Sequence, residues 1–347
     1  MAHPQPTMSL DTVALGAYLS RSVSGFAGPL TAKKFDSGQS NPTWLIETPR
    51  QKFVLRMKPP GTLLKSAHAI EREYRVMQAL AGSAVPVPRV LALCEDATVL
   101  GAAFYVMSHV EGRIFWDPAL PGLQPAERAA IYDAMNAALA ALHGVDATHA
   151  GLADFGRPGN YFARQIARWC EQYRASETGA IADMDALMAW LPANMPPDDG
   201  RSAIVHGDWR IDNMIFAPDE PKLLAVLDWE LSTLGHPVAD LAYQCMQWRL
   251  PHAGDFRGLD GVDRAALGIP DEAAYVAAYC RRRGLQGIGP WTFYLAFSFF
   301  RLAAILQGVK KRAMTGNASN PERGLKMGAA VPVLARLAQE LIASQKP

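Results

Sequence analysis

The sequence predicts an α+β protein with two lobes: a small β-rich N-terminal lobe that holds one helix, and a larger, mostly helical C-terminal lobe. Three observations support this prediction. The chain has 347 residues, which is enough for two hydrophobic cores. Short β-branched and aromatic runs separated by turns fill residues 33–110, and three-to-four-residue apolar spacing dominates afterwards. Strands and helices segregated in this way along a chain are typical of α+β architectures.

The first lobe is expected to contain five strands and one helix. PPG at 59–61 breaks the chain before the helix, which has a candidate N-cap at Ser66 and ends at Gly82. The expected strands are KKFDSG (33–38), PTWLIET (42–48), KFVLRM (52–57), VPVPRVLAL (85–93) and AAFYVMSHV (102–110).

The second lobe is expected to be helical from its start. QPAERAAIYDAMNAALAALHG (124–144) and NYFARQIARWCEQYRA (160–175) both have helical apolar spacing. LPANMPPDDGR (191–201) is rich in Pro, Asp and Gly and is expected to be a loop.

One apolar stretch, WTFYLAFSFFRLAAILQGV (291–309), is long enough to span a membrane. It carries Arg301 near its middle and Gln307 near its end, and both side chains are unfavourable in hydrocarbon. We interpret the stretch as a buried helix of the large lobe and expect no membrane association.

Composition and charge narrow the class of protein. Half of the residues are hydrophobic and 19% are charged, which is globular composition. A net charge of +1 gives no general attraction to nucleic acid. The four cysteines lie far apart without a CxxC pair, so neither a zinc site nor a disulfide scaffold is expected. The N-terminus has no secretion signal, and we expect a cytoplasmic protein.

Polar residues suited to phosphoryl transfer are concentrated in IVHGDWRIDNMIF (204–216) and LAVLDWE (224–230). Asp208 and Asn213 are framed by apolar residues that would hold a short loop against a core, and Asp228 follows an apolar run, as a metal ligand at a strand end would. Phosphoryl transfer needs a carboxylate to orient the attacking hydroxyl and oxygen ligands for Mg²⁺. The alternative is that these are ordinary loop residues between strands.

HGDxxxxN followed by LDWE resembles the catalytic and metal-binding segments of the aminoglycoside phosphotransferase and choline kinase family, which has a bilobal protein-kinase-like fold. The resemblance implies that Asp208 is the catalytic base, that Asn213 and Asp228 hold Mg²⁺, and that ATP is the phosphate donor. It also implies a nucleotide-binding lobe over residues 1–109 and a catalytic and acceptor-binding lobe over residues 110–347.

The turn in FDSGQSNPTWLIE (35–47) resembles the family's GGxSN nucleotide loop, with Ser37 where the first Gly is usual. Gly38, Gln39 and Ser40 are therefore candidates to bring backbone N–H groups close to phosphate. An ordinary hairpin turn is the alternative.

Arg56 stands where the family carries a strand lysine that contacts the nucleotide phosphates and pairs with a helix glutamate. At 100° per residue, Glu73 falls at the edge of the helix's apolar face, whereas Glu71 points away from it. A carboxylate on a buried face needs a partner, so we predict an ion pair between Arg56 and Glu73. The alternatives are an outward-facing strand charge and a solvated helix charge. The apolar face consists of Ile70, Tyr74 and Met77.

FYVMSHVEGR (104–113) resembles the segment that joins the two lobes, where the adenine would pair with backbone groups near His109 and Val110. GHPVADLAY (235–243) resembles the family's GDPxxDLA, with His236 replacing the usual Asp. This likeness gives Asp240 a structural role, anchoring the catalytic loop.

Three further residues in these motifs are interpreted without a catalytic role. His206 is expected to be a packed histidine that hydrogen-bonds to backbone near Asp228, and Trp229 is expected to lie in the core. Glu230 either assists the metal or forms a salt bridge, and the sequence leaves both open.

The acceptor is expected to be a small-molecule hydroxyl rather than a protein. Gly207 occupies the position where protein kinases carry an Arg, and the eleven residues between Asp228 and Asp240 are too few for a peptide-docking segment. Residues 230–347 carry a net charge of +5 and the rest −4, which favours a neutral or anionic acceptor over a polycationic aminoglycoside. The alternative is that the basic run RRRG (281–284) only caps a helix C-terminus.

The segment after VLRMKP is especially similar to kinase-like domains associated with acyl-CoA dehydrogenases. The resemblance implies a functional link to such an enzyme and suggests a hydroxyacyl-CoA thioester as the acceptor. Two other functions stay open. A kinase-fold protein that binds nucleotide without turnover would fit Arg56 and the altered glycine loop, and an aminoglycoside-resistance kinase would fit the family. The sequence does not reveal the oligomeric state.

Overall fold

The computed structural model describes residues 10–35, 41–59, 69–253, 257–316 and 320–344. The chain forms two compact units. Unit 1 consists of Met1–Ala81, Val87–Glu111 and Leu227–Glu230, and unit 2 consists of Gly82–Pro86, Gly112–Val226 and Leu231–Pro347. A five-stranded antiparallel sheet precedes a mostly helical region, which confirms the predicted α+β class. The lobe boundary expected between residues 109 and 110 is not the same division as these two units, and it stays a prediction.

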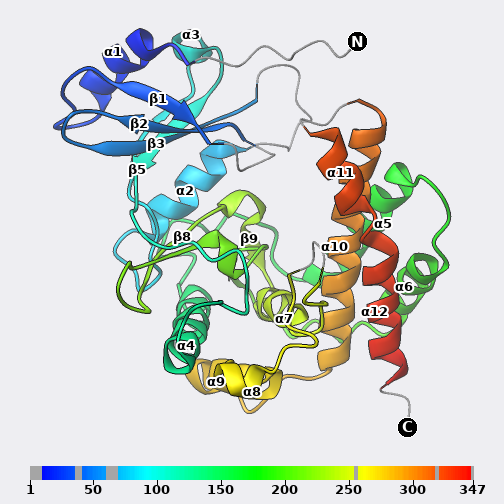
Figure 1. The fold of residues 1–347 in the computed structure, drawn as a ribbon. Helices are drawn as coiled ribbons and strands as arrows, with labels where there is room; N and C mark the ends of the chain where they lie inside the picture. The colour runs from blue at the N-terminus through cyan, green and yellow to red at the C-terminus, as the bar shows by residue number, and fades with distance from the viewer. Residues whose placement is uncertain (1–9, 36–40, 60–68, 254–256, 317–319, 345–347) are drawn as a thin grey trace. The chain divides into compact units, whose positions relative to one another are not determined.

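Unit 1 is built on an antiparallel sheet with the strand order β1-β2-β3-β5-β4 (Figure 1). Strands were predicted at all five places, and β-branched and aromatic residues predominate in β2 and β5. The strands are β1 (Thr31–Lys34), β2 (Thr43–Glu47), β3 (Lys52–Met57), β4 (Val90–Cys94) and β5 (Phe104–Ser108).

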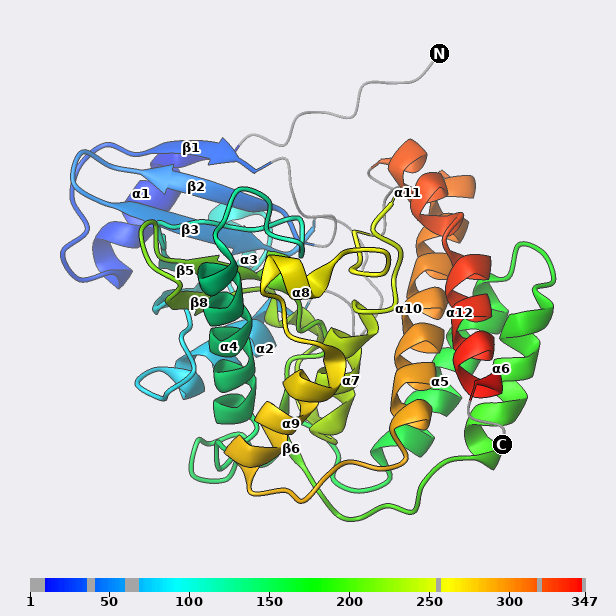
Figure 2. The same ribbon diagram turned by 60° about the horizontal axis from the view of Figure 1, so that its bottom comes forward.

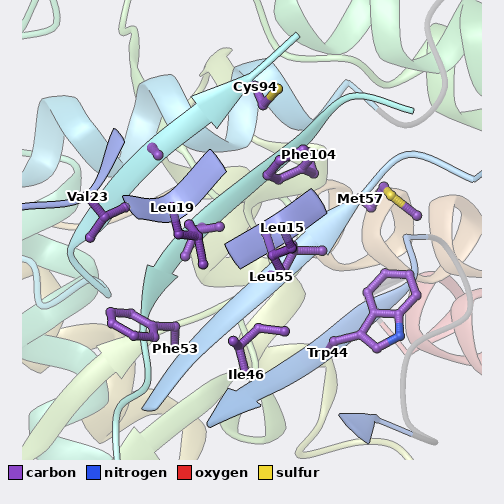
Figure 3. Close-up of a cluster of buried hydrophobic side chains, with 12 residues drawn as sticks. Leu15, Leu19, Val23, Trp44, Ile46, Phe53, Leu55, Met57, Cys94 and Phe104 are labelled. Carbon is purple, nitrogen blue, oxygen red and sulfur yellow. The ribbon is translucent and has the colours of Figure 1, made fainter. Parts of the chain in front are cut away.

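Alternation along the strands divides the sheet into two faces. On one face, Leu55 of β3 packs against Leu15 and Leu19 of helix α1 (Thr12–Ser22), within the cluster that Figure 3 shows. The next residue, Arg56, therefore points to the opposite face, together with its cross-strand partner Tyr105.

Helix α2 (Ile70–Leu80) supplies the opposite face, because its Glu73 contacts both Arg56 and Tyr105. The expected N-cap, Ser66, lies outside the described residues, and the described helix begins at Ile70. Unit 1 also contains α1 and the short α3 (Ala97–Leu100). The sequence predicted only one helix in this lobe, α2, so these two helices were missed. Asp11 caps α1 by accepting from two backbone N–H groups of the first turn.

Unit 2 is mainly helical, and α10 (Trp291–Met314) runs through its centre between α7 and α12 (Figure 2). By length and composition α10 could cross a membrane, but 72% of its most apolar stretch is buried within the protein. This burial confirms the core helix predicted at 291–309. The other helices are α4 (Pro125–Leu142), α5 (Tyr161–Ser176), α6 (Ala182–Ala193), α7 (Val238–Met246), α8 (Arg264–Leu267), α9 (Glu272–Arg283), α11 (Pro321–Gly328) and α12 (Val331–Ala343).

Two short two-stranded sheets in unit 2 flank the polar motifs. Strand β6 (Ala203–Val205) pairs with β9 (Thr233–Gly235), and β7 (Met214–Phe216) pairs with β8 (Leu223–Val226). The loop expected at 191–201 begins slightly later, because α6 continues to Ala193. Buried apolar strands on each side hold the intervening loop against the core.

Candidate active site

The loop that follows β6 is fixed through its backbone. Buried Asp240 of α7 accepts hydrogen bonds from the backbone N–H groups of His206 (2.6 Å) and Gly207 (2.8 Å). Gly207 has φ +86°, and a Cβ at this position would lie 2.8 Å from the Leu231 carbonyl oxygen, so a larger residue would not fit. The predicted anchoring role of Asp240 is confirmed.

A second layer of buried groups supports Asp240. The His143 Nε2 lies 3.4 Å from the Asp240 carboxylate, and the Nδ1 of the same ring lies 2.7 Å from the Tyr279 hydroxyl. Burial opposes ionisation of Asp240, but the His143 contact and the loop N–H groups hold its pKa below the ordinary value. Asp240 is therefore a carboxylate at neutral pH and a strong acceptor for the loop.

His206 is fully buried, which confirms that it is a packed residue. Its Nδ1 accepts a hydrogen bond from the backbone N–H of Asp208 at 3.1 Å. The ring therefore helps to shape the turn that presents Asp208.

The side chains of Asp208 and Asn213 meet directly. A 3-10 turn over Ile211–Asn213 returns the chain, and the Asn213 Nδ2 donates to the Asp208 backbone oxygen (2.9 Å) and to its Oδ2 (3.0 Å). The Asn213 amide oxygen makes no hydrogen bond with any part of the chain that the structure describes. It is thus available as an oxygen ligand.

The Asp208 carboxylate is surrounded by donors. The Arg210 Nε lies 3.4 Å from its Oδ2, and the Tyr243 hydroxyl interacts with it. Burial opposes ionisation, but these two groups, with His206 and Asn213, hold the pKa of Asp208 below its ordinary value. Asp208 is consequently anionic at neutral pH and can accept a hydrogen bond from a hydroxyl group.

A pocket of about 560 Å³ in unit 2 adjoins this loop, because Arg210 and Tyr243 belong to its wall. Lys326 of α11 supplies a second cation, and no Asp or Glu is found among the described lining residues. The lining is therefore mainly apolar with two basic side chains, of which Arg210 is paired with Asp212 at 2.8 Å. Its main apolar lining residues are Met246, Leu250, Leu302, Leu306 and Met327.

Unit 1 carries a separate cluster of charges around Arg56. The Arg56 Nε lies 2.9 Å from the Glu73 Oε2, and both side chains are largely buried (14% and 2% exposed). The N–H at Nε is not directed at that oxygen, so the contact is an ion pair rather than a well-aligned hydrogen bond. The predicted pair is confirmed, whereas the more exposed Glu71 pairs with Lys58 (2.8 Å).

Glu73 is held by two further side chains. The Asn41 Nδ2 donates to one carboxylate oxygen (2.9 Å) and the Tyr105 hydroxyl to the other (3.1 Å). Burial raises the pKa of Glu73 to about 7, while the Arg56 cation and these two donors act in the opposite direction. Burial also acts against the Arg56 cation, but the surrounding carboxylates keep its pKa above the ordinary value. Arg56 is therefore always charged.

Arg56 also contacts the LDWE segment. Its Nη2 donates to the Asp228 Oδ1 at 3.0 Å and to the Glu230 Oε2 at 3.3 Å. Glu230 thus forms a salt bridge, the second of the two alternatives considered for it, and Trp229 between them is buried as predicted. Asp228 has φ +63°, a conformation that is strained for a non-glycine residue and common at functional sites. Its Oδ2 has no partner among the described residues.

The remaining predicted nucleotide contacts are less defined. Gly38, Gln39 and Ser40 lie outside the described residues. His109 and Val110 follow β5, and the His109 backbone N–H donates weakly to the Lys52 carbonyl oxygen at 3.4 Å. Their role in adenine binding stays a prediction.

Sequence reasoning missed Tyr243, His143 and Asn41, although all three contact the predicted carboxylates. Each is distant in sequence from its carboxylate, and a single Tyr, His or Asn carries no recognisable spacing. Tyr243 and Asn41 did lie in recognised motifs, because Tyr243 ends GHPVADLAY and Asn41 ends the SGQSN segment that resembles GGxSN.

Comparisons with known proteins identify the family of the chain. Residues 31–292 match the model of the phosphotransferase enzyme family. The chain is 50% identical over 316 residues to acyl-CoA dehydrogenase family member 10 of Mus musculus, covering 90% of this chain and 30% of the relative. It is 43% identical over 338 residues to acyl-CoA dehydrogenase family member 11 of Rattus norvegicus, covering 94% and 43%. The chain thus spans less than half of the length of these relatives.

Solved structures show the same fold. A crystal structure from Ralstonia eutropha, provisionally named an aminoglycoside phosphotransferase, is 53% identical with a TM-score of 0.88, covering 98% of this chain and 100% of that one. The ternary complex of aminoglycoside phosphotransferase APH(4)-Ia with ADP and hygromycin B superposes with a TM-score of 0.63 at 15% identity, covering 97% and 99%. The motifs, the sheet and these matches together establish that the chain belongs to the phosphotransferase enzyme family.

Proposed function

We propose that the protein is an ATP-dependent phosphotransferase that moves the γ-phosphate to a hydroxyl group of a small neutral or anionic acceptor. The observation that carries this proposal is the state of Asp208. Its carboxylate is anionic, is held in place by Asn213 and Tyr243, and lies beside a pocket of small-molecule size. A fixed carboxylate next to a pocket can orient an attacking hydroxyl and accept its proton.

Side-chain oxygens without a hydrogen-bond partner are the candidate ligands for Mg²⁺, and Arg56 is the candidate contact to the nucleotide. The Asn213 amide oxygen and the Asp228 Oδ2 have no partner among the described residues, and hard cations such as Mg²⁺ prefer such donors. Bound Mg²⁺ would neutralise charge on the transferring phosphate. Arg56, oriented by Glu73, would contribute its guanidinium to the nucleotide phosphates. The two solved complexes of APH(4)-Ia with ADP and with AMP-PNP support ATP as the donor.

The pocket favours an acceptor with an apolar body and a negative charge. The lining contains two basic side chains, Arg210 and Lys326, and a polycationic aminoglycoside would find no carboxylate among the described lining residues. A hydroxyacyl-CoA thioester has the required hydroxyl, apolar chain and phosphates. The relatives named as acyl-CoA dehydrogenases also support this acceptor and a functional link to such an enzyme.

A direct test measures ADP release from Mg²⁺-ATP with hydroxyacyl-CoAs, and with the same acyl-CoAs lacking the hydroxyl as matched controls. Choline, sugars and aminoglycosides complete the panel. We expect ADP release only with a hydroxylated acceptor and only when Mg²⁺ is present.

The other outcomes identify the alternatives. Tight ATP binding without ADP release with any acceptor would indicate a nucleotide-binding protein without turnover. Activity confined to aminoglycosides, together with drug resistance of expressing cells, would indicate a resistance kinase. Equal activity with the acyl-CoAs that lack the hydroxyl would show that ATP is hydrolysed rather than used for transfer.

A further inference from the structure

Arg301 is a buried cation that the proposed chemistry leaves unused. It lies on α10, is only 4% exposed, and its Nε has no hydrogen-bond acceptor. No hydrogen bond or ion pair of the described residues involves Nη1 or Nη2, and neither of them is among the fully buried atoms without a partner, so they keep some access to solvent or ligand. A guanidinium stays charged at every physiological pH and has five N–H donors to satisfy.

The other buried arginines show how unusual this is. Arg128 donates to the carbonyl oxygens of Leu120 and Leu267. Arg56 contacts three carboxylates. Burying an ion is strongly unfavourable unless it is paired, so an isolated buried guanidinium indicates a partner outside the chain.

Aromatic rings hold Arg301 in place. Its guanidinium carbon lies 5.8 Å from the Trp169 ring centroid and 5.6 Å from that of Tyr243. Cation–π contacts offset part of the desolvation, but a ring face offers no acceptor along the plane of the guanidinium. The group is therefore fixed in position with its hydrogen-bonding capacity unused, which is the condition of a preformed oxyanion receptor.

The location connects Arg301 to the proposed acceptor pocket. Tyr243 lines the pocket, interacts with Asp208 and contacts Arg301. On α10, Leu302 and Leu306 line the same pocket, and Arg301 directly precedes Leu302, about 100° around the helix from it. Arg301 is therefore linked to the pocket through Tyr243, behind the wall that Leu302 and Leu306 form.

We propose that Arg301 is a specificity residue that binds an oxyanion, a carboxylate or phosphate group, beside Tyr243. The inference rests on the proposed function, which supplies the oxyanion. The oxyanion belongs either to the acceptor or to the phosphoryl group being transferred. The planar fork of the guanidinium suits two oxygens of either group.

The first experiment needs no turnover. Thermal unfolding of the full chain is followed in a buffer without oxyanions, and then with inorganic phosphate or acetate added. Ligand that binds only the folded state raises the Tm, by several degrees at about 100 times the dissociation constant. We expect this rise in the wild type and a much smaller one in Arg301→Met.

The same experiment separates binding from a structural role. Without oxyanion, Arg301→Met should unfold at the wild-type temperature or above, because it removes an unpaired buried charge. Arg301→Lys keeps the charge and should keep part of the response. Arg168→Met is the matched control: Arg168 also contacts the Trp169 ring, at 5.4 Å, but is exposed, and its variant should respond as the wild type does.

A second experiment identifies the source of the oxyanion. Transfer to a hydroxy acid is compared with transfer to its uncharged amide. If the acceptor supplies the group, Arg301→Met should lower kcat/KM for the acid roughly 10- to 150-fold and leave the amide unchanged. An equal loss for both would assign the oxyanion to the transferred phosphoryl group.

Two results would overturn the proposal: no Tm response of the wild type to either anion, or an equal response of Arg301→Met. Strong destabilisation of Arg301→Met with its anion response intact would also overturn it, because Arg301 would then be a structural residue. An anion response without any transfer activity would leave this site standing and refute the proposed function instead.

Discussion

The ion pair of Arg56 and Glu73 makes an asymmetric prediction about stability. Arg56→Met leaves the Glu73 carboxylate, only 2% exposed, with Asn41 and Tyr105 as its remaining donors. Stranding a buried charge usually costs about 3–5 kcal/mol. Because burial already raises the pKa of Glu73 to about 7, protonation limits the loss at neutral pH, and we expect about 3 kcal/mol.

The reverse substitution should cost less. Glu73→Gln leaves Arg56 with Asp228 at 3.0 Å and Glu230 at 3.3 Å, so the cation keeps two partners. We expect a loss of about 1–2 kcal/mol, the value of a hydrogen bond to a charged group. The double variant should lose less than the sum of the two, by about 1–2 kcal/mol.

Urea unfolding of the full chain, with the slope of the transition checked for constancy, measures all four free energies of unfolding. Additivity within about 0.5 kcal/mol would show that the two side chains do not interact. A larger loss of unfolding free energy for Glu73→Gln than for Arg56→Met would refute the asymmetry, because it would show that Arg56 depends on Glu73 more than Glu73 depends on Arg56.

Three further predictions concern pH, metal and backbone. The folded-state pKa of Glu73 is about 7 against an ordinary 4.5, so the contribution of Glu73 to stability is full below pH 4.5 and is lost as pH rises through 7. Urea unfolding across this range should show that the free energy of unfolding declines by at most about 3 kcal/mol, and that Glu73→Gln removes the decline. A profile that Glu73→Gln leaves unchanged would contradict the pKa shift. Asp228→Ala should abolish the Mg²⁺-dependent part of the ATP affinity measured by calorimetry, and Asn213→Ala should weaken this part less, because a neutral amide contributes less than a carboxylate. Equal ATP affinity of the wild type with and without Mg²⁺ would refute both expectations. Gly207→Ala should lower the free energy of unfolding more than Gly261→Ala does, by about 1 kcal/mol or more. Both glycines have positive φ, but only at position 207 would the added Cβ clash with the Leu231 carbonyl oxygen. Equal losses in the two variants would refute the steric argument.

Local periodicity carried enough information for most of the fold. The helical phase of residues 70–80 selected Glu73 over Glu71, the family resemblance selected Arg56, and the structure brings these two side chains together. Helix α1 was missed because Gly16 and its serines interrupt the apolar pattern, and its burial depends on Leu15 and Leu19 meeting strands that follow later in the chain.

The site was predictable only where residues are close in sequence. Asp208, Asn213 and Asp228 carry a recognisable spacing, whereas Tyr243 reaches the pocket and Arg301 contacts Tyr243 through the packing of α7 and α10. The sequence also left two readings of Glu230 open. The salt bridge to Arg56 could be recognised only from three-dimensional distances.

The most direct test of the central claim compares Asp208→Asn with the wild type in transfer from Mg²⁺-ATP to the best acceptor of the panel. Asp212→Asn, in the same loop and paired with Arg210 at 2.8 Å, is the matched control. We predict that Asp208→Asn lowers kcat by roughly 10²–10⁴-fold while the ATP dissociation constant stays within a few-fold, because the carboxylate acts in the transition state. Asp212→Asn should retain most of the activity. Turnover of Asp208→Asn within a few-fold of wild type would contradict the account.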